Sequence, residues 1–570
     1  MKKRFLNFMA LTAISVCLVS LQSCDKDDAE EAGSVITTEV VKTDAEAETL
    51  GNAVYGPLQR LSSSFTWLTE VPTEHAISFE AAEDNGGPII SRINISSVNG
   101  VQPAHDYVDK IFQRLYESVG NSNIAIDKLD SSRVTDKLHQ EIKDIVKARV
   151  KLTRALSYLA LVQLYGEVPL ILSTSNKPTE RASIDAVYTQ IVKDLTEAEE
   201  FLPPFDHYKF VPSKGAANAL LARTYLVWAS KPLSSAEVDA IKNNTGDPAA
   251  PQWDNAKLQK AVEYADKVIN SGYYKLLDDF NRNFDLGGED GDEHIFTIKH
   301  EGDGIDAQGN HQTHCTFTNA FGGREQGAVD VHVNPADEKY YTSDNFFVPG
   351  DKRKLLSIIT RLFRSDEGNK EYSFAFPEVA PAFGKWIHRG GYATTGTSPT
   401  IERANGVSAV AHQNNINRIE IRYAEVLLIK AEALLWLGRA SEGLPLINQI
   451  RTRAGVPALN ALTKEDLYRE WELELFFEQK HWTNSVRWRT LISNVKKVKD
   501  FEYYKEIYKD EASIRAAFPE YPDINASLFA HIYSHLHSKY DNIKGRNYRF
   551  PIPQTSGITN LGITVQNPGY

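Results

Sequence analysis

Residues 422–457 read RYAEVLLIKAEALLWLGRASEGLPLINQIRTRAGVP and contain two helical patterns separated by a glycine. In the first pattern, apolar and small residues recur at the spacing of one helix face, at Ala424, Leu428, Ala431 and Leu435. The small residues among them allow a second helix backbone to approach closely. Gly438 predicts the end of this helix, because glycine adopts the left-handed conformation of a C-terminal cap without strain.

A second helix is predicted from Ala440 to Ala454, where Gly455 and Pro457 stop it. Its inward face carries Leu444, Ile447 and Ile450. Thr463 then predicts an N-cap, with Asp466 three residues further on, ahead of a third long helix. The apolar residues of this third helix are Trp471, Leu475, Phe476 and Trp482. Helix pairs joined by short turns predict a mostly α fold, a helix-hairpin stack of tetratricopeptide type.

The rest of the chain alternates between helical and irregular stretches. Helical patterns occupy residues 45–62, 106–129, 134–165, 184–202, 215–230 and 256–271. Residues 63–103 carry loop signals, and a connection this much longer than the usual ~4–6 residues is more often functional. From residue 273 to 416 the helical period fades, and short alternating runs such as residues 295–298 indicate strands. We therefore expect an irregular insertion of loops and short strands, after which residues 491–540 return to a helical pattern.

Residues 1–23 form a predicted lipoprotein signal peptide, which is not part of the fold. Basic residues at positions 2–4 precede the apolar run Phe8–Val19, which is shorter than the ~20 residues that cross a bilayer. The following LQSC sequence matches a lipobox, so Cys24 is predicted to carry the lipid; an ordinary secretory signal is the alternative. At ~0.8 kcal/mol per buried methylene, two or three acyl chains would hold the protein firmly at a membrane. Residues 24–44 are predicted to be an acidic tether.

The composition is that of an ordinary globular protein, with 42% hydrophobic and 24% charged residues among 570. The net charge of −12 argues against binding of nucleic acid, which needs a concentrated basic face. Of the three cysteines, Cys17 leaves with the signal and Cys24 is acylated, so Cys315 is the ordinary thiol that remains. No disulfide framework is then possible within the chain, and the fold must rest on its core.

No catalytic signature is present in the sequence. The chain lacks H-E-x-x-H, G-x-S-x-G and G-x-x-x-x-G-K-[ST]. A pair of carboxylates would suit a glycosidase, but Glu70 and Glu74 are one helical turn apart and acidic residues are common everywhere. We therefore predict no catalytic residues and no enzymatic activity.

Metal ligands of the usual kinds are present without the usual spacing. A group of histidines and one cysteine lacks the paired arrangement of a structural zinc site, so we interpret them as loop residues: His294, His300, His311, His314, Cys315 and His332. Asp303, Asp306 and Asn310 supply oxygen ligands suited to calcium, but they miss the EF-hand spacing. We predict no cofactor and no bound metal, with calcium left open.

Three charged residues lie in the first helical stretch: Arg422, Glu425 and Glu432. They are either ligand contacts or a structural set of ion pairs between packed helices. We favour the structural interpretation, with Arg451 or Arg453 as a partner. Three tryptophans are likewise interpreted as core residues of the helix stack, namely Trp471, Trp482 and Trp488.

Several long motifs of this chain resemble the SusD/RagB family. The C-terminal motifs are the stretch quoted first, YREWELELFFEQKHWTNSVRW at residues 468–488 and the terminal QNPGY at residues 566–570. The upstream motifs are LSYLALVQLYGEVPL (156–170), TERASIDAVYTQIVKDLTEAEEFLP (179–203) and SKGAANALLARTYL (213–226). Motifs in this order over most of the chain imply a SusD-like fold, with an N-terminal helical region at 45–272 and a C-terminal region at 273–570. The latter would comprise the insertion 273–416, helices at 418–490 and a closing segment at 491–570.

The family resembled here consists of surface lipoproteins that capture nutrients, mostly glycans. The resemblance implies an outer-membrane protein that is anchored by lipid on Cys24 and faces the cell exterior. The acidic residues 25–31 resemble the tag that directs such lipoproteins to the surface. An oligosaccharide is the implied ligand, and a SusC-like TonB-dependent transporter is the implied partner, over which the protein would act as a lid. Peptides are the alternative ligand, and an enzyme is disfavoured by the missing signatures.

Resemblance and residue chemistry together place the ligand between two loop regions. Aromatic rings pack against the C–H faces of sugars, and planar polar side chains bond to hydroxyl groups. On the first long loop the predicted ligand-binding residues are Trp67, Glu74, Phe79, Arg92 and Asn94. In the central insertion they are Phe317, Asn319, Phe321 and Arg324.

Overall fold

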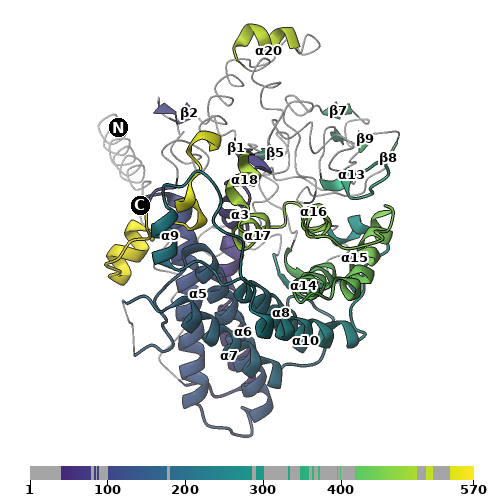
Figure 1. The fold of residues 1–570 in the computed structure, drawn as a ribbon. Helices are drawn as coiled ribbons and strands as arrows, with labels where there is room; N and C mark the ends of the chain where they lie inside the picture. The colour runs from purple at the N-terminus through teal and green to yellow at the C-terminus, as the bar shows by residue number, and fades with distance from the viewer. Residues whose placement is uncertain are drawn as a thin grey trace, which may run out of the picture. The chain divides into compact units, whose positions relative to one another are not determined.

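The structure is a computed structural model, and it describes sixteen stretches of the chain. They are residues 40–78, 83–84, 87–88, 101–175, 180–284, 291–300, 331–333, 347–357, 362–364, 370–372, 385, 394–395, 398–399, 417–496, 509–517 and 539–570. The chain divides into two units, residues 1–41 and 42–570, and every element below belongs to the second. Figure 1 shows its helices and strands.

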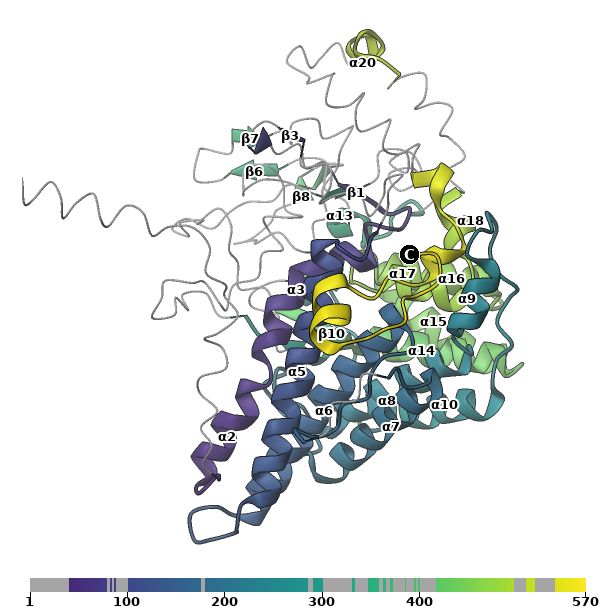
Figure 2. The same cartoon turned by 90° about the vertical axis from the view of Figure 1, so that its left-hand side faces the viewer.

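The N-terminal region folds as a row of helices in which each packs against the next (Figure 2). In chain order they are α3 (Gly56–Thr69), α5 (Asp106–Ser131), α6 (Gln140–Tyr165), α7 (Ile184–Phe201), α8 (Lys214–Ala229) and α10 (Asn255–Asn270). Their facing sides are apolar and buried, which is what stabilises such a row. The helical patterns predicted between residues 106 and 271 are confirmed, except that α6 begins at Gln140 and not at residue 134. A short α9 (Ser235–Ile241) follows α8.

The first predicted helix is in fact two helices. The first is α2 (Asp44–Ala53), which Thr43 caps by accepting a hydrogen bond from the Glu46 backbone N–H. After a turn, α3 continues to Thr69, so the prediction of a loop from residue 63 is wrong and Trp67 lies in a helix. The serines that suggested a loop are tolerated because α3 packs against α5. Ser62, for example, is buried and its hydroxyl lies 2.8 Å from His300 Nε2.

The C-terminal helices confirm the pattern from which the fold was predicted. Helix α14 (Tyr423–Trp436) and helix α15 (Ala440–Ala454) form a hairpin, and α14 also packs against α8 and α10. Gly438 and Gly455 have φ angles of 74° and 77°, the left-handed conformation expected of helix ends. Helix α16 (Lys464–Glu474) begins with the predicted cap, in which Thr463 and Asp466 bond to each other's backbone N–H.

The third predicted helix is shorter than expected. It ends at Glu474, and a separate helix α17 (His481–Trp488) follows a six-residue break. Phe477 and Gln479 have φ angles of 58° and 65° in this break, which is rare for residues other than glycine. Tertiary bonds compensate, because the Gln479 side chain donates to Ser62 O at 2.6 Å and to Thr66 Oγ1 at 2.8 Å.

Short antiparallel strand pairs supply the predicted loop and short-strand component. Strand β4 (His294–Ile298) pairs with β10 (Arg418–Arg422), which runs directly into α14. Strand β1 (Ala76–Ser78) pairs with β5 (Val331–Val333). The other pairs are β2 (Glu83–Asp84) with β3 (Gly87–Pro88), β6 (Leu362–Arg364) with β7 (Lys370–Tyr372), and β8 (Thr394–Thr395) with β9 (Ser398–Pro399). The mostly α fold with short strands is therefore confirmed.

The C-terminal segment of the chain packs against the N-terminal helices. In the QNPGY motif, Asn567 donates to Tyr165 O at 2.9 Å and to Phe550 O at 2.7 Å. Gly166, at the end of α6, leaves room for the Arg549 guanidinium, which a Cβ atom would overlap. The remaining helical segments are α13 (Lys354–Ser357), α18 (Leu491–Lys496), α20 (Glu511–Ala517) and the short turns Phe280–Phe284, Gly545–Tyr548 and Gln554–Asn560. None of the helices described in this chain combines the length and the apolar character that a bilayer crossing requires.

Candidate functional site

Arg422, the last residue of β10, is the centre of a buried set of ion pairs. Its guanidinium lies 2.7 Å from Glu293, 2.6 Å from Glu474 and 2.9 Å from Glu478. Arg453 shares two of these carboxylates, those of Glu293 and Glu474. Burial alone would raise the pKa of Glu474, but the surrounding arginines lower it far below its usual range. The set fixes the break between α16 and α17 to strand β10.

The two acidic residues that the sequence singled out in α14 also form buried ion pairs with neighbouring helices. Glu425 bonds to Arg223 of α8 at 2.7 Å, and Glu432 bonds to Arg487 of α17. The structural interpretation is thus confirmed for these residues, but the expected partners were wrong. Arg451 bonds instead to Glu470, and Arg453 bonds to the partners of Arg422. The three tryptophans are buried core residues as predicted, at Trp471, Trp482 and Trp488.

The chain between α3 and β1 is held against the α16–α17 break. Glu70 Oε1 accepts a hydrogen bond of 3.0 Å from the Lys480 backbone N–H. Lys539 donates to the carbonyl oxygens of Val71 at 3.0 Å, Ala76 at 3.1 Å and Thr73. Burial raises the pKa of the Glu70 carboxyl to about 7. Residues 70–76 therefore have a fixed position on the C-terminal helices.

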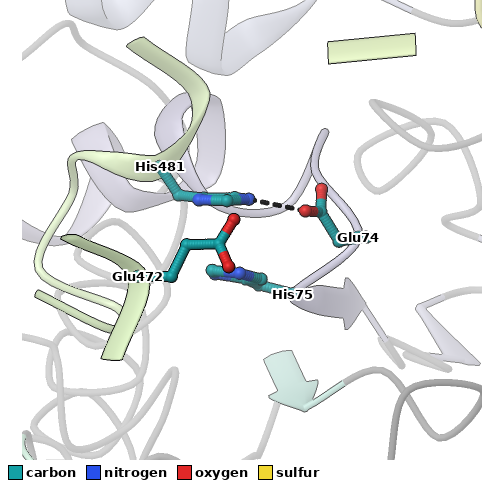
Figure 3. Close-up of side chains that lie close together, drawn as sticks. All are labelled: Glu74, His75, Glu472 and His481. Atoms are coloured by element: carbon teal, nitrogen blue, oxygen red, sulfur yellow. Dashed lines mark hydrogen bonds and ion pairs between the residues drawn. The ribbon is translucent and has the colours of Figure 1, made fainter. Parts of the chain in front are cut away.

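Glu74, His75, Glu472 and His481 form a cluster at this junction (Figure 3). His481 Nε2 lies 2.8 Å from Glu74 Oε1, and the His75 ring stacks on the His481 ring with centroids 3.4 Å apart. Burial opposes the charge on His481, but Glu74 raises the pKa of this histidine to about 9. Burial lowers the pKa of His75 well below its usual value. At neutral pH the pair is therefore a charged His481 and a neutral His75.

The expectation that Glu74 contacts a ligand from a surface loop does not fit this environment. Glu74 is 8% exposed, and its carboxylate bonds to His481. The other members of the cluster were not predicted as site residues. Glu472 and His481 lie in a stretch that has the pattern of a core helix, and His75 is far from both in sequence. No spacing in the sequence signals that these residues meet.

The remaining predicted residues divide into two groups. Most lie outside the described residues: Cys24, Phe79, Arg92, Asn94, Phe317, Asn319, Phe321 and Arg324, and also Asp303, Asp306 and Asn310. Three of the histidines interpreted as loop residues are described, and two of them are strand residues: His294 begins β4 and His332 is the middle residue of β5. His294 and His300 are buried in protein contacts. His294 Nε2 lies 3.1 Å from Asn283 O, and His300 Nε2 lies 2.8 Å from Ser62 Oγ.

The β1–β5 pair connects the two regions from which ligand contacts were predicted. Its register pairs Ala76 with Val333 and Ser78 with Val331. Ser78 directly precedes the predicted contact Phe79, and Arg324 lies shortly before Val331 in the chain. The first long loop and the central insertion therefore meet at one ladder, next to the Glu74 cluster.

A cavity lies among helices α3, α5, α6, α8, α14, α16 and α17. Its lining includes leucines, among them Leu58, Leu115 and Leu156, and also charged side chains. These charges bond to one another, because Arg223 and Arg418 both contact Glu420. Burial would raise the pKa of Glu420, but the neighbouring cations lower it to about 2. We assign no ligand to this cavity.

The helical frame and its buried ion pairs belong to a known protein family. The model described as "SusD family" matches residues 279–570, slightly more than half of the chain. The chain belongs to the SusD family. A second family model, described as "Starch-binding associating with outer membrane", matches residues 54–226 of this SusD-family protein. The second range contains helices α3 to α7 and most of α8, and the first contains strand β10 and helices α14 to α18.

Named relatives of this SusD-family protein span its length. SusD-like protein P2 of Formosa agariphila is 24% identical over 608 aligned residues that cover all of both chains. The starch-binding protein SusD of Bacteroides thetaiotaomicron is 24% identical over 75% of this chain and 76% of its own. Among solved structures, a SusD homolog of the same species superposes with a TM-score of 0.66 at 21% identity, covering 96% of this chain and 99% of the homolog. A laminarin-binding SusD-like protein gives a TM-score of 0.62 at 21% identity, covering 93% and 100%.

Proposed function

We propose that this protein binds an oligosaccharide non-covalently at the cell surface and delivers it to a SusC-like TonB-dependent outer-membrane transporter. The observation that carries the proposal is the β1–β5 ladder, which joins the two loop regions whose residue chemistry suits a sugar. Named relatives that bind starch and laminarin support a glycan as the ligand. The protein would be a carrier that leaves the glycan intact.

The proposed glycan contacts lie on the two segments that continue from the ladder. They are Phe79, Arg92 and Asn94 on one side, and Phe317, Asn319, Phe321 and Arg324 on the other. Trp67 is retained as a candidate at the end of α3, whereas Glu74 is omitted because it is buried against His481. Two lysines support the chain at the base of the ladder: Lys480 of the α16–α17 break bonds to Glu70, and Lys539 bonds to the carbonyl oxygen of Ala76 in β1. A rigid base of this kind reduces the ordering cost of binding.

The test is calorimetric titration with β-1,3-glucan and α-1,4-glucan oligosaccharides, because named relatives bind laminarin and starch. Truncation of a central aromatic or arginine contact typically costs ~2 kcal/mol, and ~1.4 kcal/mol corresponds to a tenfold loss of affinity. Phe317→Ala and Arg92→Ala should therefore each weaken glycan binding tenfold or more. Thermal melts of the same variants should be unchanged, since the helical rows do not depend on these side chains.

Tyr273→Ala is the matched control, because Tyr273 is an aromatic residue that is 46% exposed just after α10. Its affinity for the glycan should equal that of the parent protein. Unchanged affinity in the Phe317 and Arg92 variants would contradict the placement of the site. Binding of peptides with no binding of any glycan would contradict the ligand class. Release of new reducing ends in proportion to protein would contradict a carrier without hydrolytic activity.

A further inference from the structure

The cluster at the junction of α3, β1 and the α16–α17 break has the composition of a metal site. Its donors are two imidazole rings and two carboxylates, from His75, His481, Glu74 and Glu472. One ligand atom from each of the four lies within 4.8 Å of each of the others. We propose that these side chains bind a divalent transition-metal ion of the Zn²⁺ type. This site does not depend on the proposed glycan binding, and the sequence did not predict it.

The donor set agrees with the chemistry of such ions. Zn²⁺ is bound by histidine nitrogen and carboxylate oxygen at about 2.0–2.2 Å, with four ligands in a tetrahedral arrangement. Ligand atoms of one ion are then roughly 3.3 Å apart. His481 Nε2 and Glu74 Oε1 are already 2.8 Å apart, and the full set spans no more than 4.8 Å. Side-chain shifts of the order of 1 Å would therefore complete the coordination, and His481 would release to solvent the proton that it carries at neutral pH, because a histidine ligand is neutral.

Three separate segments hold the ligands in place. Glu74 and His75 lie in the turn before β1, which Lys539 fixes through backbone carbonyl groups on either side of them. His481 is the first residue of α17, and Glu472 lies in α16, whose positions are set by the ion pairs around Arg422. Figure 3 shows the four side chains converging from these segments. A site whose ligands are held by the fold loses little freedom when the ion binds.

The surroundings supply a partner for the ligand His75 and balance the charge of the ion. His75 Nδ1 lies 3.9 Å from Glu70 Oε2, on the side where histidine ligands of metals commonly face a carboxylate. The carboxylates of Glu74 and Glu472 together match the charge of a divalent cation, as a buried ion requires. Glu472 is half-buried while the other three are buried, so the ion would approach from the Glu472 side.

The experiment measures zinc in the purified protein after stripping with chelator, incubation with ZnSO₄ and dialysis. Elemental analysis should give about one tightly bound zinc ion per chain. Glu472→Gln keeps the size of this half-buried side chain but removes a negative ligand, and should weaken zinc binding at least tenfold in competition with a chelating dye. The melting temperature should rise on zinc addition in the parent protein and not in this variant. Co²⁺ in place of Zn²⁺ should give the intense visible absorption of a four-coordinate site.

Asp44→Asn provides the control, because Asp44 Oδ2 lies 2.6 Å from His139 Nδ1 at the surface and forms an ordinary histidine–carboxylate pair. This variant should bind zinc like the parent. His75→Gln should lose zinc as Glu472→Gln does; if His75→Gln fails to fold, the Glu472 variant decides alone. Absence of retained zinc in the parent, or equal zinc affinity in the parent and Glu472→Gln, would show that the cluster is only a buried ion pair and would overturn the proposal.

Discussion

Arg422 and Arg353 are both fully buried, and each keeps its charge by bonding to several carboxylates. Arg353 lies 2.8 Å from Asp351 and 2.5 Å from Glu470, and it also contacts Glu474, which is shared with Arg422. A single buried ion pair rarely recovers the cost of removing two charges from water. Connected sets recover more of it, because each carboxylate and each guanidinium group bonds to more than one partner. When one charged side chain of such a set is removed, its former partners remain buried without a counter-charge, and the folded state is destabilised.

At Glu420 the contribution of a buried ion-paired carboxylate to the free energy of unfolding can be measured as a function of pH. Its pKa is lowered from 4.5 to about 2, so its contribution to stability is complete above pH 4.5 and is lost as the pH falls through 2. The shift corresponds to ~3 kcal/mol. Glu420→Gln should therefore lower the free energy of unfolding by about that amount at pH 7. Urea unfolding at pH 7 and pH 3.5 should show that the difference from the parent protein narrows at the lower pH.

Glu442→Gln is the control for this change. Glu442 also bonds to an arginine, Arg439, at 2.6 Å, but both side chains are exposed to solvent. Water screens such surface pairs, so this variant should unfold like the parent protein at both pH values. If Glu420→Gln also left the unfolding curve unchanged at pH 7, the buried pairs would not contribute to stability as described.

At the scale of elements, helix ends that depend on local chemistry were predictable and the break between α16 and α17 was not. Gly438, Gly455 and the Thr463–Asp466 cap all lie where the sequence placed them. The break has no glycine or proline to mark it. Its positive φ angles at Phe477 and Gln479 are held by bonds to α3, a helix far away in sequence.

The same reasoning explains the limits of the site prediction. Loop composition and the family resemblance predicted two regions with residues suited to binding a sugar, and the β1–β5 pair joins the chain segments that contain them. Sequence could not identify the cluster around His481, because a histidine at this place in a helical motif has the pattern of a core residue. Only the folded chain brings Glu74 and His75 to within 4.8 Å of it.

Two glycines with opposite roles test the importance of local backbone conformation. Gly455 caps α15 with a φ angle of 77°, where an alanine would be strained. Gly120 lies within α5, and a Cβ atom there would meet nothing within 4 Å. Gly455→Ala should destabilise the protein by about 1–2 kcal/mol, and Gly120→Ala should stabilise it by about 0.5–1 kcal/mol. Chemical denaturation of both variants and the parent protein measures these changes in the free energy of unfolding. Changes of the same sign in the two variants would contradict this account.

At the scale of the whole molecule, the two family-matched regions are joined by buried charge as well as by helix packing. Arg223 of α8 bonds to Glu420 and Glu425, and α8 packs against α14. Ion pairs have strict geometric requirements, so they set the register in which the two regions meet.

The predicted lipobox and acidic tether lead to a prediction for intact cells. Cys24→Ser should abolish labelling by a palmitate analogue, because the serine hydroxyl does not take the place of the thiol in the lipobox. Neutralising the acidic residues 25–31 should leave the label in place but reduce cleavage by protease added outside the cells. Persistent labelling of the Cys24 variant would contradict the proposed lipid anchor.

The junction at residues 70–76 also determines when the protein can finish folding during synthesis. Lys480 and Lys539, which hold this segment, leave the ribosome long after α3 has been made. The N-terminal helices can form early, but residues 70–76 cannot make their contacts with Lys480 and Lys539 until nearly the whole chain has been translated. Contacts between such distant parts of a chain slow folding. If the predicted signal peptide at residues 1–23 directs export, this delay is useful, because a chain that cannot complete its structure early stays open enough to be passed across a membrane.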